Sequence, residues 1–255
     1  MYNFHTHTFR CHHAEGSDED YVLQAIKNGY DTIGFSDHAP YLFPNGYVSS
    51  FRMLPSDAKD YVDSINALKN KYQDKINIKL GFELEYYPKL IDDEIEFLKS
   101  FNYDYLILGQ HYTDNEYEEY AKYSGAVTTS VAVLDKYISQ VILGAKSGLF
   151  TYVAHPDLIR FKGDNDIYKA KMRYLATELK KIGIPLEFNF LGFTAKRNYP
   201  NPDFWQIVKE VGNDVVIGLD AHKPQVYADK ENLKKAKDYL KSLDIAPIEE
   251  IELVR

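Results

Sequence analysis

Tyr105-Leu106-Ile107-Leu108-Gly109-Gln110-His111 is a short apolar run, typical of a buried strand, that ends in a histidine. The same arrangement of an apolar run closed by histidine recurs at residues 1–5, 33–38, 151–155 and 215–222. Histidines scattered at random would not keep falling just past such runs. The repeated pattern therefore predicts that imidazoles gather on one rim of a sheet or barrel.

Length and composition limit the class of protein. The chain has 255 residues, and an α/β barrel of about 250 residues is a single domain, so we expect one domain over residues 1–255. The net charge of −8 argues against nucleic acid as a partner, because phosphate backbones attract basic surfaces. No apolar run approaches the roughly 20 residues of a membrane span. The sequence gives no indication of oligomeric state.

The start of the chain and its cysteine content predict a cytoplasmic protein. The first residues show neither the basic start nor the apolar core of a signal peptide. Cys11 is the only cysteine, so no intrachain disulfide can form, which fits a reducing compartment.

Strand and helix patterns alternate along the chain. This alternation predicts parallel strands joined by right-handed crossovers, with ligands bound beyond the carboxyl ends of the strands. Ser17, with Asp20 three positions later, predicts a helix N-terminus. The expected strands are 1–5, 31–36, 76–83, 104–110, 151–154, 185–190 and 214–219, and the expected helices are 18–28, 56–73, 130–146, 167–182, 203–211 and 230–242. The segment 243–255 is either a last strand or a tail.

The residues at the strand ends are metal-ligand types. His5 and His7 are two apart, so on a strand both point to one face, and Asp220 and His222 repeat this spacing. Glu83 ends the third expected strand, where a carboxylate can bridge two ions. Imidazole with carboxylate favours Zn, Mn or Fe over Mg or Ca. The nine candidate ligands predict two or three ions: His5, His7, His13, His38, Glu83, His111, His155, Asp220 and His222.

A structural role is the alternative for any one of these residues. A lone histidine at a strand end is usually a satisfied polar group. Five separate strand ends that all supply ligand types favour a shared site instead. His12 and Cys11 are assigned to structural roles, His12 as a solvated neighbour of His13 and Cys11 as a small buried residue.

In this order the residues resemble the motifs of the polymerase-and-histidinol-phosphatase (PHP) superfamily, from residue 3 to residue 224. The motifs are His5-x-His7, His13, Asp37-His38, Glu83, His111, His155 and Asp220-x-His222. Within the superfamily the chain is most similar to the monofunctional histidinol-phosphate phosphatases. The stretches that carry this similarity are residues 11–14, 36–40, 81–86, 155–160, 187–189 and 220–224.

The resemblance implies a distorted, TIM-like (β/α)7 barrel with three metal ions at the carboxyl ends of its strands. By this analogy Glu83 bridges two ions. The first ion takes His5, His7, Glu83 and Asp220; the second takes Glu83, His111 and His155; the third takes His13, His38 and His222.

The implied activity is hydrolysis of L-histidinol phosphate to L-histidinol and phosphate in histidine biosynthesis. Clustered metal ions lower the pKa of bound water and neutralise charge on phosphoryl oxygens, so we expect a metal-bridging hydroxide to attack phosphorus. Asp220 or His222 is a candidate to relay a proton to the leaving alcohol, although each is also a candidate ligand.

Other residues are candidates for contact with this small-molecule phosphate ester. Arg160 and Arg197 lie in loops on the expected rim, and guanidinium groups match phosphoryl oxygens in shape and charge. Glu15, Glu85 and Asp114 lie in or near rim loops and can accept hydrogen bonds from the histidinol ammonium and imidazole. Asp37 is a further candidate of the same type. Each of these four acids is alternatively a solvated charge or a group that orients a metal-bound histidine.

Three alternatives stay open at this point. The same site can serve a phosphatase or phosphoesterase with another substrate, such as phosphotyrosine, because the site does not show what lies behind the phosphate. An amidohydrolase also opens with H-x-H, but that family usually has a bridging lysine where this chain has Glu83. A metal-binding module without turnover is the third.

Overall fold

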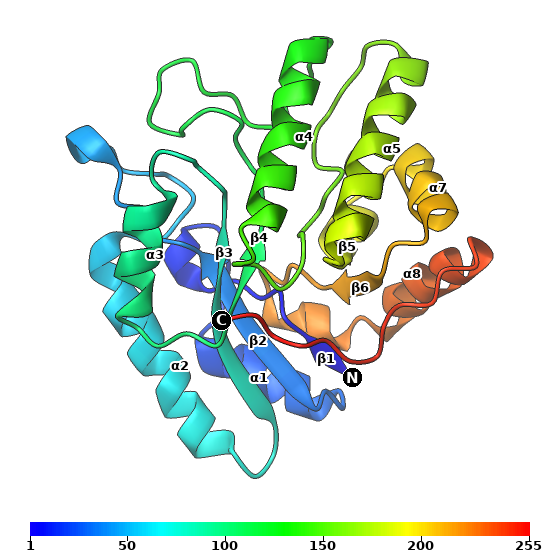
Figure 1. The fold of residues 1–255 in the computed structure, drawn as a ribbon. Coiled ribbons are helices and arrows are strands. Elements are labelled where there is room, and N and C mark those ends of the chain that lie inside the picture. Colours follow the sequence, from blue (N-terminus) through cyan, green and yellow to red (C-terminus); the bar gives the residue numbers. More distant parts are fainter.

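Six parallel strands form the centre of the structure, a computed structural model that covers residues 1–255 (Figure 1). One sheet contains β1 (Tyr2–Asn3), β2 (Thr32–His38), β3 (Asn77–Leu84) and β4 (Tyr105–Leu108) in that order. The other pairs β5 (Leu186–Asn189) with β6 (Val215–Gly218). The β2–β3 register sets His38 opposite Glu83, which places two candidate ligands side by side at one rim.

Isolated bridges join the two sheets into a distorted barrel. Val153 bridges to Leu108 of β4 and to Leu186 of β5, both in parallel. On the other side, Thr6 bridges to Ala221 in parallel. The α/β barrel class predicted from the sequence is therefore confirmed. The expected strand 151–154 is present only as this bridging segment, because it pairs at a single residue on each side.

Eight α-helices lie outside the strands (Figure 1). All six expected helices are confirmed to within two residues at each end, and Ser17 caps α1 as predicted by accepting a hydrogen bond from the Asp20 amide. Two helices were not predicted, α3 and the short α6. The bounds are α1 Asp18–Lys27, α2 Ala58–Tyr72, α3 Ile91–Lys99, α4 Val131–Lys146, α5 Asn165–Ile182, α6 Phe190–Thr194, α7 Pro202–Val211 and α8 Lys230–Ser242.

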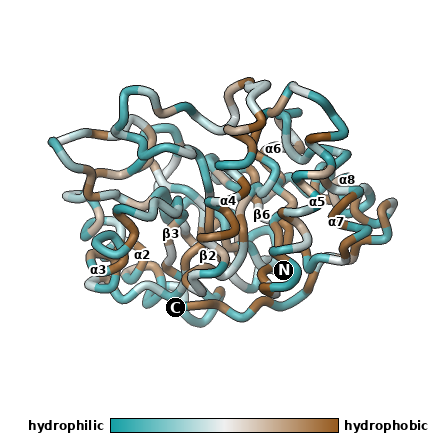
Figure 2. Tube along the Cα trace, turned by 45° about the horizontal axis from the view of Figure 1, so that its top comes forward, coloured by the Kyte–Doolittle hydropathy of each residue, from teal (hydrophilic) through white to brown (hydrophobic).

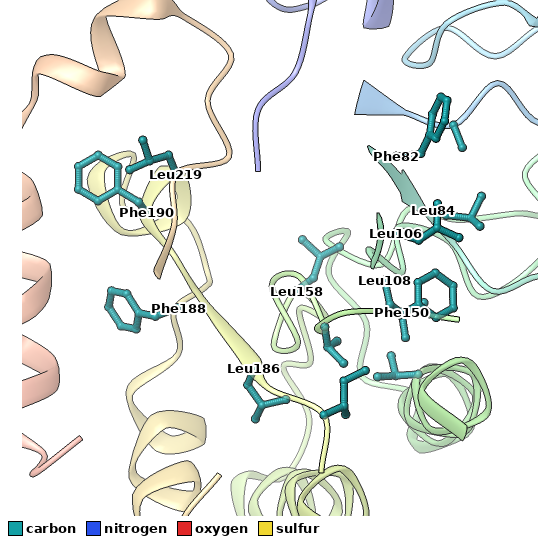
Figure 3. Close-up of a cluster of buried hydrophobic side chains, with 14 of the residues drawn as sticks. Phe82, Leu84, Leu106, Leu108, Phe150, Leu158, Leu186, Phe188, Phe190 and Leu219 are labelled. Carbon is teal, nitrogen blue, oxygen red and sulfur yellow. The ribbon is translucent and has the colours of Figure 1, made fainter. Parts of the chain in front are cut away.

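Alternation along the strands divides the core into two parts. In β4, Leu106 and Leu108 belong to the large cluster between strands and helices, part of which is drawn in Figure 3. Tyr105 and Ile107 point the other way, into a smaller cluster with Phe4. Figure 2 shows the apolar residues concentrated along the central strands, with hydrophilic residues along the outer loops. None of the helices has the length and apolar character that a membrane crossing requires.

The segment 243–255 is a tail rather than a strand. It runs from α8 across the amino-terminal ends of the strands, as the red segment in Figure 1 shows. The Ile248 amide donates to the Val215 carbonyl at 2.8 Å, and the Val254 amide donates to Thr151 Oγ1 at 3.0 Å. Ile248, with Ile251 and Leu253, packs against the small interior cluster. The tail thus covers the end of the barrel opposite the histidines.

Candidate metal centre

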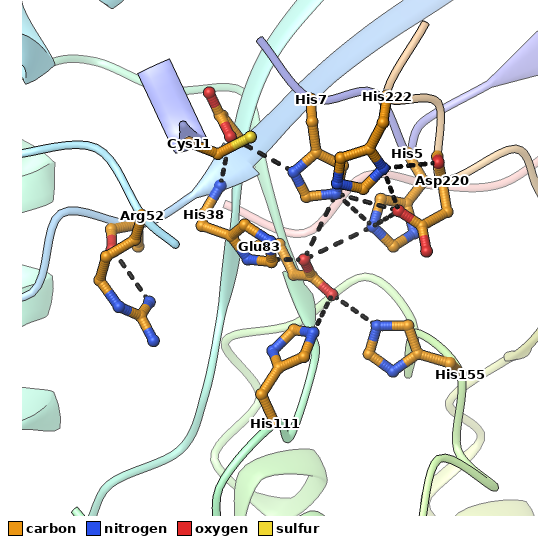
Figure 4. Close-up of polar contacts among 12 residues, drawn as sticks. His5, His7, Cys11, His38, Arg52, Glu83, His111, His155, Asp220 and His222 are labelled. Carbon is orange, nitrogen blue, oxygen red and sulfur yellow. Dashed lines mark hydrogen bonds and ion pairs between the residues drawn. The ribbon is translucent and has the colours of Figure 1, made fainter. Parts of the chain in front are cut away.

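The structure brings all nine candidate metal ligands together at the carboxyl end of the barrel. Figure 4 shows all of them except His13. His5 and His7 follow β1, His38 ends β2, and Glu83 lies near the end of β3. The other five come from the segments after β4, Val153 and β6, and from the loop that precedes α1. Eight of the nine are more than four-fifths buried, and His13 alone is exposed, at the mouth.

Glu83 stands at the centre of the cluster. Its Oε2 lies 3.0 Å from His38 Nδ1 and 3.6 Å from the Nε2 atoms of both His5 and His7. Its Oε1 lies 2.8 Å from His155 Nε2 and 3.8 Å from His111 Nε2. The two carboxylate oxygens therefore face two separate groups of imidazoles.

Asp220 forms a second point of convergence. Its Oδ1 lies 3.1 Å from His7 Nε2, 3.6 Å from His5 Nε2 and 3.3 Å from His222 Nδ1. His222 Nε2 in turn lies 2.9 Å from His13 Nε2, at the open side of the cluster.

The donor set fits divalent cations. His5 Nε2 and His7 Nε2 face each other at 3.1 Å, so either a proton or a cation must lie between their lone pairs. Glu83 Oε2 and His38 Nδ1 are buried and form no hydrogen bond. Buried polar atoms normally have partners, and a shared cation would supply one here. Nitrogen and carboxylate donors in this mixture suit zinc, manganese or iron.

Hydrogen bonds on the outer nitrogens fix how the imidazoles are turned. His5 Nδ1 lies 2.7 Å from Glu187 Oε1, and His111 Nδ1 lies 2.8 Å from Glu85 Oε1. His7 Nδ1 is 3.3 Å from Asp37 Oδ1. Each carboxylate accepts the Nδ1 proton, so the Nε2 lone pair is directed into the cluster, as ligating histidines require.

The carboxylates in the cluster change the pKa values of its histidines and favour the binding of cations. Burial alone would lower the pKa of His5, but Glu187, Asp220 and Glu83 raise it to about 10. Burial likewise opposes ionisation of Glu83, yet the histidines around it hold its pKa well below the ordinary value. Burial and the neighbouring His7 lower the pKa of His222 to about 3. The centre therefore combines charged carboxylates with imidazoles, some of which are held neutral, and a metal ion can take the place of the proton on His5.

Backbone geometry at two strand ends is unusual. His155 has φ of 31° and Asp220 has φ of 49°, both in the left-handed region that non-glycine residues rarely adopt. Such conformations cost free energy and cluster at functional sites. Here they occur at two of the candidate ligands.

Two glycines leave room for carboxylates. A Cβ atom on Gly109 would lie 2.0 Å from Glu83 Oε1, and one on Gly218 would lie 1.7 Å from Glu187 Oε1. Both positions therefore require glycine for the carboxylates to lie where they do.

The two predicted arginines lie at the same end of the barrel but differ in their contacts. Arg197 donates from Nη1 to the Tyr199 hydroxyl at 2.8 Å, and the Tyr199 ring lies 5.7 Å from the His155 ring. Arg160 is exposed, and its backbone pairs with Ser124 and Thr128 at the rim. Both arginines are exposed, but Arg197 is linked to the cluster through Tyr199, whereas the Arg160 side chain forms no hydrogen bond.

The three predicted acids have partners within the protein. Glu15 is exposed and pairs with Lys223 at 2.9 Å, and Asp114 pairs with Lys136 of α4. Glu85 is buried, and its Oε1 accepts from His111 and from Arg52. Of the three, Glu85 alone contacts a member of the cluster.

Sequence reasoning did not assign a role to Glu187 or Arg52. Glu187 lies in β5 between Leu186 and Phe188, and a carboxylate inside a buried apolar strand was a signal for such a role. Arg52 lies in a long loop, where nothing in the pattern marked it. Asp37, named above as a candidate to orient a metal-bound histidine, accepts on Oδ1 from the His38 amide at 2.8 Å and also lies close to His7 Nδ1.

The similarity to known proteins covers most of the chain. A probable histidinol-phosphatase of Deinococcus radiodurans is 29% identical over 232 residues, 86% of this chain and 85% of that protein. A histidinol-phosphatase of Bacillus subtilis is 23% identical over 86% of this chain and 92% of its own length.

A solved structure has the same fold. It is a histidinol phosphate phosphatase from Lactococcus lactis in complex with zinc, L-histidinol and phosphate, with a TM-score of 0.73 and 19% identity over 97% of this chain and 95% of that one. The profile of the PHP domain matches residues 3–190, a span that includes seven of the nine candidate ligands. This chain is a member of the PHP domain family.

Proposed function

We propose that this chain hydrolyses L-histidinol phosphate to L-histidinol and phosphate, a step of histidine biosynthesis. The observation that carries the proposal is the position of Glu83, whose two oxygens face separate imidazole groups on a buried barrel rim. This arrangement suits a phosphoesterase with several metal ions. The similarity to histidinol-phosphatases over more than four-fifths of the chain supports the choice of substrate.

The proposed ligand set is the one that the family resemblance implies. One ion is assigned to His5, His7, Glu83 and Asp220, a second to Glu83, His111 and His155, and a third to His13, His38 and His222. His5, His7 and Asp220 each offer one ligand atom, and these three atoms lie within 4.8 Å of one another, which supports the first assignment. His38 lies close to Glu83 and groups with His7 and His222, so it could contribute to holding either the first ion or the third.

When bound, divalent ions at such a centre supply hydroxide near neutral pH and neutralise charge on the phosphoryl oxygens. The protein supplies buried carboxylates and imidazoles to hold these ions. Glu187, Glu85 and Asp37 fix the orientation of three of the imidazoles. Uncatalysed hydrolysis of phosphate monoesters is extremely slow, so electrostatic stabilisation of this kind is the main demand on the site.

Arg197 is the proposed phosphate contact. Its hydrogen bond to the Tyr199 hydroxyl links it to a ring that lies 5.7 Å from the His155 ring. Arg160, exposed like Arg197 and on the same rim, is the second candidate, because no hydrogen bond links its side chain to the cluster. Asp220 and His222 are the candidates for proton transfer to the leaving alcohol, because they form the open side of the cluster with His13.

The test compares substrates. Phosphate release from L-histidinol phosphate is measured with Mn- or Zn-loaded protein, beside a phosphotyrosine ester and a phosphodiester, each with and without chelator. The proposal expects turnover of histidinol phosphate that chelator abolishes and that far exceeds the other two. Preference for the phosphotyrosine ester would keep the metal centre and overturn the substrate, whereas no metal-dependent turnover would overturn the activity.

A further inference from the structure

The segment between β2 and α2 carries a buried arginine for which the proposed reaction has no role. Arg52 is 1% exposed, and its guanidinium forms four hydrogen bonds to acidic side chains and the backbone. A buried charge that is so fully paired is costly to place and leaves uncompensated partners when it is removed. The positions of these hydrogen-bond partners indicate the role of Arg52.

One partner of Arg52 is shared with a proposed metal ligand. Glu85 Oε1 accepts from Arg52 Nη2 at 3.1 Å and from His111 Nδ1 at 2.8 Å. His111 Nε2 then faces Glu83 on its other side.

The other partners lie on both sides of the site. Glu116 Oε2, in the segment that follows His111, accepts from Arg52 Nε at 2.9 Å and from Nη2 at 2.6 Å. Arg52 Nη1 donates to the carbonyl of Ala39, the residue after His38. Arg52 therefore joins the chain after β2 to the chain after β4, through partners that adjoin His38 and contact His111. Figure 4 shows Arg52 at the side of the cluster.

The neighbouring aromatic ring completes the arrangement. The Arg52 guanidinium carbon lies 4.4 Å from the centre of the Phe51 ring. That ring lies 5.0 Å from the His38 ring and 5.7 Å from the His111 ring, so it forms an apolar wall against both imidazoles. Holding Arg52 in place also holds this wall.

We propose that Arg52 is a positioning residue that fixes the His111 imidazole through Glu85 and ties it to the loop that carries Glu116. This inference rests on the proposed metal-binding role of His111. A planar guanidinium can satisfy two carboxylates and a carbonyl at once, which an ammonium group cannot do with the same geometry. Lysine at this position should therefore fail to replace it.

The test separates positioning from stability with two variants. In Arg52→Met both carboxylates lose their cation, so folding and His111 orientation both suffer. In the double variant Arg52→Met/Glu116→Gln one of the two uncompensated charges is removed, so the melting temperature should recover in part, whereas Glu85 still lacks its partner. Leu179→Ala, a buried truncation in α5 far from the cluster, controls for loss of stability alone.

Cobalt binding is measured for each protein, wild type first. The number of bound ions, the dissociation constant and the visible spectrum are recorded. Loss of an outer partner weakens metal binding about 10- to 100-fold, so we expect at least about 10-fold weaker binding of one ion in Arg52→Met and in the double variant. Leu179→Ala should bind as wild type does. Recovery of cobalt affinity together with melting temperature in the double variant would overturn the inference. If wild type binds no cobalt, the proposed function itself fails, and the inference with it.

Discussion

Individual side chains set the properties of this site by holding other side chains in place. Glu187 shows this most clearly, because it is fully buried and serves three groups. Its Oε1 accepts from His5 Nδ1, and its Oε2 accepts from the His155 amide at 3.0 Å and from Asn189 at 2.8 Å. A single carboxylate thus fixes both the imidazole that follows β1 and the strained backbone at His155.

Replacing Glu187 with glutamine tests this role. The amide keeps the shape but loses the charge that accepts the His5 proton, so we expect metal affinity to fall about 10- to 100-fold. Titration of the metal-free protein in a metal-buffered solution measures the change. Glu178→Gln, a partly buried position on α5 whose carboxylate pairs with Lys181 and contacts no candidate ligand, is the control. Equal affinity in the Glu187 variant and wild type would refute the role.

Gly109 offers a second test at the scale of one residue. In Gly109→Ala the new Cβ would need the space of Glu83 Oε1, so the carboxylate must move, and we expect at least about a 100-fold loss of kcat/KM. Gly148→Ala is the control, because Gly148 has open space around it and a φ of 72°, so alanine there strains only the backbone. Near-normal kinetics in Gly109→Ala would show that Glu83 need not lie where it does.

Some residues of the site could be predicted from the sequence and others could not. Residues at strand ends could be found because an apolar run followed by histidine is visible along the chain. Glu187 was visible as a charge inside an apolar strand, but its partner His5 lies 182 residues away. Arg52 had no local signal at all, since its role arises only when the segments after β2 and β4 meet.

At the scale of elements, the periodicity of the sequence predicted most of the strands and helices. It did not predict the short or weakly paired elements correctly. The segment around Val153 looks like a strand in sequence but pairs through single bridges, because the barrel is distorted there. Helix α3 was missed although Ile91, Ile95 and Leu98 are spaced for one buried face. Helix α6 is only five residues long, too short for any period to be visible.

Helix α3 carries a buried acid that predicts how stability depends on pH. Glu94 is 1% exposed, its Oε2 accepts only from the Leu42 amide at 3.2 Å, and burial raises its pKa to about 7 from 4.5. Between these values the unfolded chain loses the proton and the folded chain keeps it. This group therefore lowers the free energy of unfolding as pH rises from 4.5 to about 7, and its penalty is complete above pH 7.

Glu94→Gln should remove that penalty, because the amide resembles the protonated acid. We expect the variant to match wild type near about pH 4.5 and to exceed it in free energy of unfolding by up to about 3 kcal/mol near about pH 8. Urea unfolding of the metal-free proteins at both pH values measures this, so that metal binding does not contribute. A difference between variant and wild type that is the same at both pH values would contradict the assignment.

At the scale of the whole molecule, the barrel has an open, charged end and a covered end. Nine ligand-type residues from separate strand ends converge at the first, and the tail closes the second. The alternation of strands and helices predicted this architecture and its site-bearing rim. It did not predict the course of the tail, whose contacts are long-range bonds such as that from the Tyr2 hydroxyl to the Ile248 carbonyl.

Removing the tail tests the division between the two ends. A chain that stops at residue 246 exposes the interior cluster that Ile248, Ile251 and Leu253 cover. Three partly buried apolar side chains at about 1 kcal/mol each suggest a loss of about 3 kcal/mol in the free energy of unfolding. Metal affinity at low temperature should stay unchanged, because the ligands lie at the other end. Loss of metal binding in protein that is still folded would show that the ends are coupled.

We propose that the strand-end cluster forms one metal centre built around Glu83. The most direct measurement is the number of Zn or Mn ions bound per chain, by elemental analysis after removal of free ion, in wild type and in Glu83→Gln. We expect three ions in wild type and at least one fewer in Glu83→Gln, together with loss of phosphate release from L-histidinol phosphate. A wild-type chain without bound metal, or a variant with the full number of ions, would contradict this proposal.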